Sequence, residues 1–361
     1  MITSPTLVLD RNKTLENINK MSSKISNLGL KFRPHFKTHQ SLEIGNWFRE
    51  FPIDGITVSS LKMAKYFASG GWKSITVAFP FNILDIKEIN ALASKIDLRV
   101  LVVDSESAIE LDKRLTSNVS VYIEIDPEYG RSGIHFNDTE QIDKLISTLN
   151  NTKKLTLHGF YSHAGHSYKC RSANDLEQFS KAIINSLSQL KNKYDLSICF
   201  GDTPSCSVLK NFGAIDELSP GNFVFYDWIQ TQIGSCDPDE ITIAMKCPVV
   251  AKYPSRNELL IHGGAVHFSK DYDLLDSGEP YFGQVVQNLN GQWGKPIENC
   301  FLKSVSQEHG IIKCTDEFFN DTKPGDIITI LPIHSCLTAD LMGSYLTTDN
   351  ERISHLSEKR I

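Results

Sequence analysis

The chain has 361 residues, of which 40% are hydrophobic and 22% charged, a composition typical of a globular protein long enough for two domains. Its formal net charge of −6 comes without a long basic run, which argues against nucleic acid as a partner. No signal peptide or long apolar span is visible, and eight cysteines are scattered without a C-x-x-C pair. We therefore expect a cytoplasmic protein with reduced thiols and no membrane partner.

The first segment of the chain reads as a strand followed by a helix. A strand pattern covers Thr6–Asp10, and a helix pattern covers Asn12–Leu28. Apolar residues recur every three or four positions in the helix pattern, at Leu15, Ile18, Met21 and Ile25. Because the strand pattern stands alone ahead of the helix, we expect it to pair into a second, C-terminal domain.

Eight strand patterns then alternate with helix patterns through the first two-thirds of the chain. The predicted strands are Lys31–Pro34, Gly55–Ser59, Ser74–Phe79, Leu98–Val103, Ser120–Ile125, Thr156–Tyr161, Ser197–Phe200 and Ile215–Leu218. The helices between them are Leu42–Phe51, Leu61–Ala68, Ile83–Lys95, Glu106–Leu115, Glu140–Leu149, Leu176–Lys193 and Ser205–Phe212, with Ser105 as an expected N-cap. Such alternation predicts parallel strands and, in the simplest closed form, a (β/α)8 barrel; an open doubly wound sheet is the alternative.

From about Thr231 the pattern changes to strands at hairpin spacing, which predicts an antiparallel β domain. The predicted strands are Ile241–Lys252, Glu258–His262, Gly283–Asn288, Cys300–Val305, Gly310–Cys314 and Asp326–Pro332. We therefore predict a barrel over residues 11–230 and a β domain over residues 1–10 and 231–361.

Lys37 lies between two histidines just after the first predicted barrel strand, where barrel enzymes place their chemistry. A desolvated lysine there could form a Schiff base, although a solvated loop lysine is the ordinary alternative. The heptapeptide from Arg33 to His39 resembles the R-P-H-x-K-T-H motif of the D-serine dehydratase and D-threonine aldolase family. These are fold-type III pyridoxal 5'-phosphate (PLP) enzymes related to alanine racemase. The resemblance implies that Lys37 is both the cofactor lysine and the base that removes the α-proton.

The segments after the last two barrel strands predict a phosphate site. They read Gly201-Asp202-Thr203-Pro204-Ser205 and Ser219-Pro220-Gly221-Asn222, and ordinary turn chemistry is the alternative for either. They resemble the family segments G-x-T-P-[ST] and P-G-N, which hold the cofactor phosphate. The resemblance therefore implies that Thr203, Gly221 and Asn222 bind the cofactor.

Two further loops resemble cofactor segments of the same family. The loop after the fifth strand contains Arg131, to which the resemblance assigns the phenolate oxygen of PLP. The loop after the sixth strand reads His163-Ala164-Gly165-His166-Ser167-Tyr168, and the resemblance implies that His163 and Tyr168 flank the cofactor ring. A surface turn with an exposed arginine and a satisfied loop histidine are the alternatives.

His334 and Cys336 form a candidate metal pair at the end of the last strand pattern. In an extended segment, residues two apart project from the same face, and imidazole with thiolate suits Zn2+. Another divalent metal is one alternative, and a buried structural cysteine is another. The resemblance implies zinc, because D-serine dehydratases carry H-x-C here and D-threonine aldolases carry H-x-D.

Taken with its resemblance, the chain is expected to be a PLP- and zinc-dependent dehydratase (ammonia-lyase) of a β-hydroxy D-amino acid such as D-serine. Zn2+ on His334 and Cys336 would activate the β-hydroxyl. Retro-aldol cleavage and a non-catalytic PLP carrier are the alternatives. Racemisation is disfavoured because the segment Gly263–Asp271 lacks the tyrosine of racemases. The family further implies a homodimer with the site at its interface.

Overall fold

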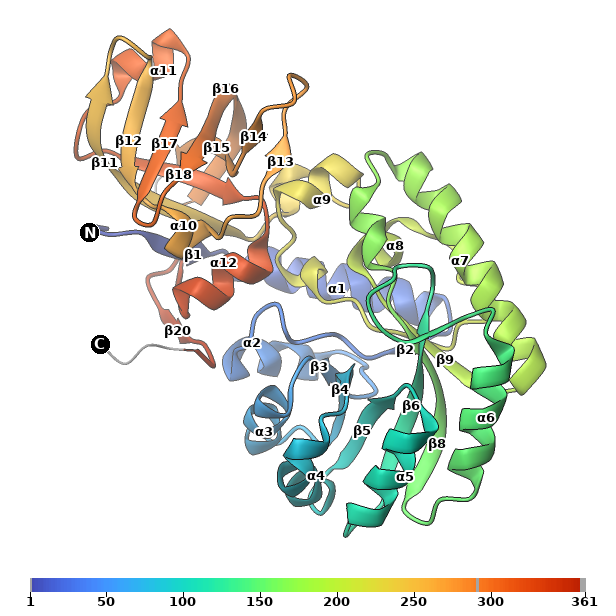
Figure 1. The fold of residues 1–361 in the computed structure, drawn as a ribbon. Helices are drawn as coiled ribbons and strands as arrows, with labels where there is room; N and C mark the ends of the chain where they lie inside the picture. Colours follow the sequence, from blue (N-terminus) through green and yellow to red (C-terminus); the bar gives the residue numbers. More distant parts are fainter. Residues whose placement is uncertain (1, 290–291, 358–361) are drawn as a thin grey trace. The chain divides into compact units, whose positions relative to one another are not determined.

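The computed structural model describes residues 2–289 and 292–357 (Figure 1). It divides into two compact units. The barrel unit consists of residues 19–37 and 48–221, and the β unit consists of residues 1–18, 38–47 and 222–361. The division differs from the predicted domain boundaries at residues 10/11 and 230/231, which remain a prediction. The chain passes from one unit to the other at Lys37–Thr38 and at Gly221–Asn222, among other points.

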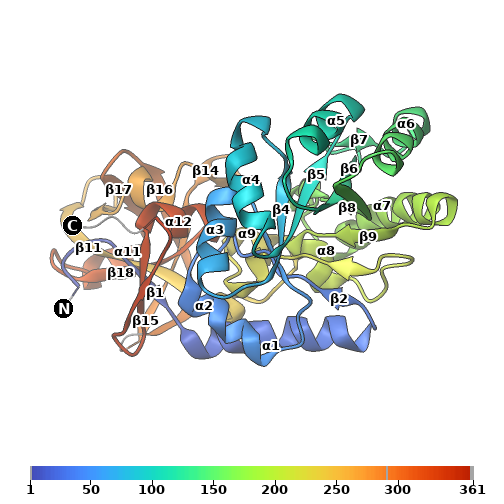
Figure 2. The same ribbon diagram turned by 90° about the horizontal axis from the view of Figure 1, so that it is seen from below.

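Eight parallel strands form the centre of the barrel unit, in the order β3-β4-β5-β6-β8-β9-β10-β2. Figure 2 shows β5, β6, β8 and β9 of this sheet. Their bounds are β2 Lys31–Phe32, β3 Ile56–Val58, β4 Ser74–Pro80, β5 Asp97–Val102, β6 Val119–Asp126, β8 Leu155–Ser162, β9 Ser197–Phe200 and β10 Glu217–Leu218. A parallel bridge between His35 and Thr57 joins the segment after β2 to β3 at the other end of the order. The ring is thereby closed, which confirms the (β/α)8 barrel and excludes the open sheet.

The predicted helices are present, with shifted ends. They are α1 Arg11–Asn27, α2 Leu42–Trp47, α3 Leu61–Ser69, α4 Ile86–Ala93, α5 Ser105–Arg114, α6 Thr139–Asn150, α7 Ala173–Tyr194 and α8 Thr203–Val208. The expected N-cap at Ser105 is wrong. The Asp104 carboxylate accepts the Ser107 amide proton at 2.7 Å, so α5 begins one residue earlier than predicted.

A buried ion pair crosses the inside of the barrel unit. Arg33 Nε lies 2.8 Å from Glu217 Oε1, and their side chains are 1% and 6% exposed. The Tyr122 hydroxyl donates to the second carboxylate oxygen at 2.9 Å. Gly55 permits this arrangement, because a Cβ at its position would lie 2.2 Å from the Arg33 guanidinium. The arginine of the lysine heptapeptide therefore links the first and last strands of the barrel.

The β unit contains one large sheet, most of which closes on itself. The strands follow the order β12-β17-β16-β15-β18-β11-β1-β19-β20, and β12 also pairs with β11, which closes a barrel of the first six. The bounds are β1 Thr6–Leu9, β11 Ile243–Tyr253, β12 Glu258–His262, β15 Gly283–Leu289, β16 Gln292–Val305, β17 His309–Lys313, β18 Ile327–Pro332, β19 Ser344–Thr347 and β20 Arg352–Ser354. The N-terminal strand β1 pairs with β11 and β19 in the β unit, as its sequence predicted.

Short helices in the β unit were not predicted. They are α9 Trp228–Ile233, α10 Ala265–Phe268, α11 Asp316–Asp321 and α12 Ser335–Met342. The prediction that Cys336 lies in an extended segment is wrong, because β18 ends at Pro332 and Cys336 is the second residue of α12. The Asp227 carboxylate accepts the Ser335 amide proton at 3.0 Å, which stabilises this helix start. Across the described parts of the chain, no helix is long and apolar enough to cross a membrane.

Candidate active site

The backbone around Lys37 is fixed at the carboxyl ends of the barrel strands. The His35 amide donates to the Pro220 carbonyl at 2.8 Å, and the Phe36 amide donates to the Thr57 carbonyl at 2.8 Å. The Lys37 amide in turn lies 3.3 Å from His35 Nδ1. Lys37 is half-buried, so its amine extends from a rigid segment at the edge where barrel enzymes place their chemistry.

An aromatic cluster holds the residue before Lys37. The fully buried Phe36 ring packs against Phe48, Phe67 and Trp72, with ring centroids 4.9, 5.1 and 5.2 Å away. Because close-packed aromatic rings leave little freedom, Phe36 fixes the direction in which Lys37 leaves the barrel wall.

His163 lies just after β8 and is held as a neutral imidazole. Its Nδ1–H donates to the Gly201 carbonyl oxygen, which leaves Nε2 with a free lone pair. Burial, with smaller contributions from the Lys37 and Arg131 charges, lowers the pKa of His163 to about 3. The Lys37 and Arg131 charges both act on the His163 imidazole. These three predicted cofactor residues therefore lie near one another in the barrel unit.

Arg131 lies in the loop after β6, beside an aromatic residue that the sequence analysis missed. The Asp126 carboxylate shapes this loop by accepting the Tyr129 amide proton at 2.7 Å. The Arg131 guanidinium carbon lies 5.3 Å from the Tyr129 ring centroid, and that ring is 6.5 Å from the His163 ring. Tyr129 therefore links Arg131 to His163. Tyr168 is half-buried in the short 3-10 helix Gly165–Lys169.

The two predicted phosphate segments follow adjacent strands, β9 and β10. Thr203 is the first residue of α8, and the Asp202 carboxylate caps that helix by accepting the Ser205 amide proton at 2.7 Å. Burial raises the pKa of Asp202 to about 6. A Cβ at Gly201 would lie 2.5 Å from the Ser219 carbonyl oxygen, so only glycine allows the segments to approach this closely. Gly221 is the last residue of the barrel unit.

His334 is oriented by a carboxylate that the sequence analysis did not select. Its Nδ1–H donates to Asp271 Oδ2 at 2.6 Å, which leaves Nε2 available as a metal ligand. Burial alone lowers the pKa of His334, but the hydrogen bonds and charges of Asp271 and Cys336 raise it to about 10. The imidazole and the thiol are within hydrogen-bonding reach of one another, close enough to bind one metal ion together.

Polar groups surround the Cys336 sulfur, which is half-buried. The Thr38 hydroxyl lies 3.3 Å from it, and the Asn222 side-chain amide lies 3.6 Å from it. Asn222 also donates to Asp227 at 2.7 Å and to Ser335 at 2.9 Å. The Asn222 amide is a donor to the sulfur, whereas either the Thr38 hydroxyl or the thiol can be the donor between them. The structure thus places Asn222 beside the candidate metal pair, and its predicted contact with the cofactor phosphate remains a prediction.

The covalent chain connects the two sets of residues. Thr38, beside Cys336, directly follows Lys37, and Asn222, also beside Cys336, directly follows Gly221. Within the β unit, Gln40 Nε2 donates to Asp340 Oδ1 at 2.9 Å, so a residue shortly after Lys37 is tied to the metal-bearing helix α12.

The fold and the strand-end lysine define an alanine racemase-like protein. Residues 9–225 match the family "Alanine racemase, N-terminal domain", and residues 243–348 match the "Putative serine dehydratase domain". A curated D-serine dehydratase of Dictyostelium discoideum is 31% identical over 96% of this chain and 93% of that protein. The chain therefore belongs to the D-serine dehydratase family of PLP-dependent lyases.

More distant relatives share the same fold. D-threo-3-hydroxyaspartate dehydratase from Delftia sp. HT23 is 25% identical over 95% of this chain and 93% of that protein. Its solved structure covers 98% of each chain with a TM-score of 0.90 and 24% identity. The fold of this chain is therefore that of a solved dehydratase.

Proposed function

We propose that this protein is a cytoplasmic PLP- and zinc-dependent dehydratase that converts a β-hydroxy D-amino acid, such as D-serine, to a keto acid and ammonia. The observation that carries the proposal is the His334–Cys336 pair, with Asp271 on His334 Nδ1 at 2.6 Å. Two donors of different softness, one of them oriented by a carboxylate, are typical of a zinc site with open positions.

The residues of the barrel unit fit PLP. Lys37 offers an amine on a rigid backbone, and the neutral His163 offers a flat ring beside it. Arg131, Tyr168, Thr203 and Gly221 would complete the set, with Asn222 from the β unit. When bound, PLP supplies an electron sink for the charge that develops at the substrate α-carbon.

The residues of the β unit fit a zinc ion. His334 Nδ1 is committed to Asp271, so Nε2 is the nitrogen that would bind the ion together with Cys336 Sγ. The Asn222 amide donates to that sulfur, and the Thr38 hydroxyl lies 3.3 Å from it. Two protein ligands would leave coordination positions open for the substrate. When bound, Zn2+ supplies a Lewis acid for the β-hydroxyl, which is otherwise a poor leaving group.

Each side chain then has a separate role in the elimination. Lys37 Nζ is the general base that takes the proton from the α-carbon. Arg131 is a permanent cation that stabilises negative charge near His163, which stays neutral and so competes for no proton. One base on one face of the substrate is sufficient for elimination. We also propose that the protein acts as a homodimer, as the family resemblance implies.

The test is a product assay on the full chain supplied with PLP and Zn2+. D-serine, D-threonine and D-threo-3-hydroxyaspartate are each assayed for keto acid and for aldehyde, with L-serine as the stereochemical control. We expect keto acid from at least one D-substrate and none from L-serine. Lys37→Ala and Cys336→Ala should lose this product, whereas Cys170→Ala, a matched change of a half-buried thiol, should keep it. Aldehyde without keto acid would instead indicate an aldolase.

A further inference from the structure

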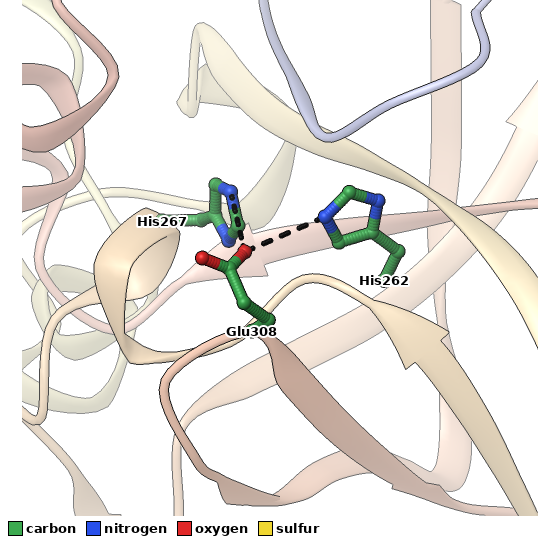
Figure 3. Close-up of side chains that lie close together, drawn as sticks. All are labelled: His262, His267 and Glu308. Carbon is green, nitrogen blue, oxygen red and sulfur yellow. Dashed lines mark ion pairs between the residues drawn. The ribbon is translucent and has the colours of Figure 1, made fainter.

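A second group of metal-ligating side chains lies elsewhere in the β unit (Figure 3). His262 ends β12, His267 lies in α10, and Glu308 lies in the turn between β16 and β17. Glu308 Oε2 is 3.5 Å from His262 Nε2 and 3.8 Å from His267 Nε2. One ligand atom from each residue lies within 4.8 Å of the other two. None of these side chains takes part in the proposed dehydratase chemistry.

The backbone holds the three side chains together. The Gly263 amide donates to the Glu308 carbonyl at 2.9 Å, and the Ala265 amide donates to the Ser306 carbonyl at 2.6 Å. A Cβ at Gly264 would lie 2.3 Å from the Ser306 carbonyl oxygen, so glycine is required for the two segments to approach this closely. The three residues of the cluster are therefore brought close together by paired backbone segments.

We propose that His262, His267 and Glu308 form a second metal site, which binds a divalent ion of the zinc class. Two imidazoles and one carboxylate suit Zn2+, whereas Mg2+ and Ca2+ prefer oxygen ligands. Tetrahedral ligands about 2.1 Å from a zinc ion lie about 3.4 Å apart. The two separations from Glu308, 3.5 and 3.8 Å, are close to that value, and the two imidazoles offer ligand atoms within 4.8 Å of one another. Side-chain movements would then complete the geometry.

The exposure of the ligands fits an ion that keeps a solvent ligand. The side chains of His262 and Glu308 are 41% and 49% exposed, and that of His267 is 15% exposed. Water can therefore fill the fourth position, as in zinc sites with three protein ligands.

The hydrogen bond between the Gly264 amide and His267 opposes metal binding and must be exchanged. The Gly264 amide lies 3.1 Å from His267 Nδ1 and donates to it, so the neutral ring carries its proton on Nε2, facing Glu308. A metal at Nε2 takes the place of that proton, and Nδ1 becomes protonated and gives up the Gly264 contact. A single neutral hydrogen bond is weak beside three metal–ligand bonds.

Such an ion would also stabilise a segment that serves the first site, and this consequence rests on the proposed function. Asp271, which orients His334, follows His267 by four residues, and the Phe268 carbonyl between them accepts a hydrogen bond from Thr338 of α12 at 3.4 Å. Fixing His267 therefore restrains the segment that carries Asp271.

The test counts Zn2+ bound to the metal-stripped full chain, by titration against a chromophoric chelator. We expect two tightly bound ions in the wild type and one in Cys336→Ala. In the Cys336→Ala background, His262→Asn and Glu308→Gln should each lower the affinity for the remaining ion by more than about 100-fold. Losing a residue that only orients a metal ligand costs about 10–100-fold. His309→Asn is the matched control, because His309 is the exposed neighbour of Glu308 and lies outside the cluster.

Co2+ gives an independent readout of the same sites, because a thiolate ligand adds a charge-transfer band that the His262–His267–Glu308 set cannot produce. One zinc ion in the wild type and none in Cys336→Ala would overturn the second site and leave the proposed function intact. A remaining ion that still binds tightly in both the His262→Asn and the Glu308→Gln variants would also overturn the second site. Conversely, one ion that is insensitive to Cys336→Ala but lost with His262→Asn would support the second site and contradict the zinc part of the proposed function.

Discussion

Replacing Arg33 by methionine tests the role of the buried ion pair inside the barrel. In the native protein Arg33 Nε lies 2.8 Å from Glu217, and its two terminal nitrogens reach the Ser74 hydroxyl at 3.1 Å and the Asp54 carbonyl at 3.0 Å. Methionine keeps most of the apolar stem but leaves Glu217 buried without its main partner. Removing one member of a buried pair costs about 3–5 kcal/mol, so we expect the free energy of unfolding to fall by that amount at pH 7.

The pH dependence of this loss has a definite sign. Burial raises the pKa of Glu217, but Arg33, Tyr122 and Arg99 together bring it below its ordinary value of 4.5. In the wild type the carboxylate therefore contributes stability above that value, and the contribution is lost as the pH falls through the lowered pKa. Without Arg33, burial should raise the pKa of Glu217 above 4.5. The free energy of unfolding of the variant is therefore lowered most at high pH. The difference between the two proteins should shrink as the pH falls from 7 toward 5.

Urea unfolding followed by circular dichroism measures this difference. Arg114→Met is the matched control, because Arg114 forms an exposed ion pair with Glu110 one helical turn away and should cost about 0.5 kcal/mol or less. The double variant Arg33→Met with Glu217→Gln should lose at least about 1 kcal/mol less than the sum of the single changes. If Arg33→Met costs no more than the control, or if the two changes add without coupling, the buried ion pair does not stabilise the barrel in this way.

Three further predictions concern the candidate active site. Borohydride treatment of the PLP-loaded protein should attach the cofactor to Lys37, and peptide mapping that finds another lysine would contradict the assignment. Asp271→Asn should weaken Zn2+ binding at His334 and Cys336 by about 10–100-fold, measured by chelator competition, because the carboxylate orients the imidazole. Chelation should abolish keto-acid formation without unfolding the protein, whereas removal of a structural zinc would unfold it. A metal-free enzyme with full activity would exclude the zinc mechanism.

Much of the fold follows from local patterns in the sequence. All eight barrel strands were predicted, because buried parallel strands read as short apolar runs separated by helix-period segments. The pairing of β1 into the β unit also followed from the sequence, since a strand pattern standing alone needs a partner sheet elsewhere. The error at Cys336 arose because a distant residue decides the local structure. Cys336 was expected in an extended segment, yet Asp227 accepts the Ser335 amide proton and helps α12 to begin there.

The sequence by itself determined which residue types are present and where the strands end, and so selected Lys37, Arg131, His163, His334 and Cys336. Only the tertiary structure decided what surrounds them. Asp271 lies 63 residues before His334, and Thr38 lies 298 residues before Cys336, separations at which no periodicity or spacing carries information. Residues that orient a metal ligand or shift its pKa are distant in the sequence and come together only when the chain folds. For that physical reason Tyr129, Asp271 and the His262–His267–Glu308 cluster became visible only in the folded chain.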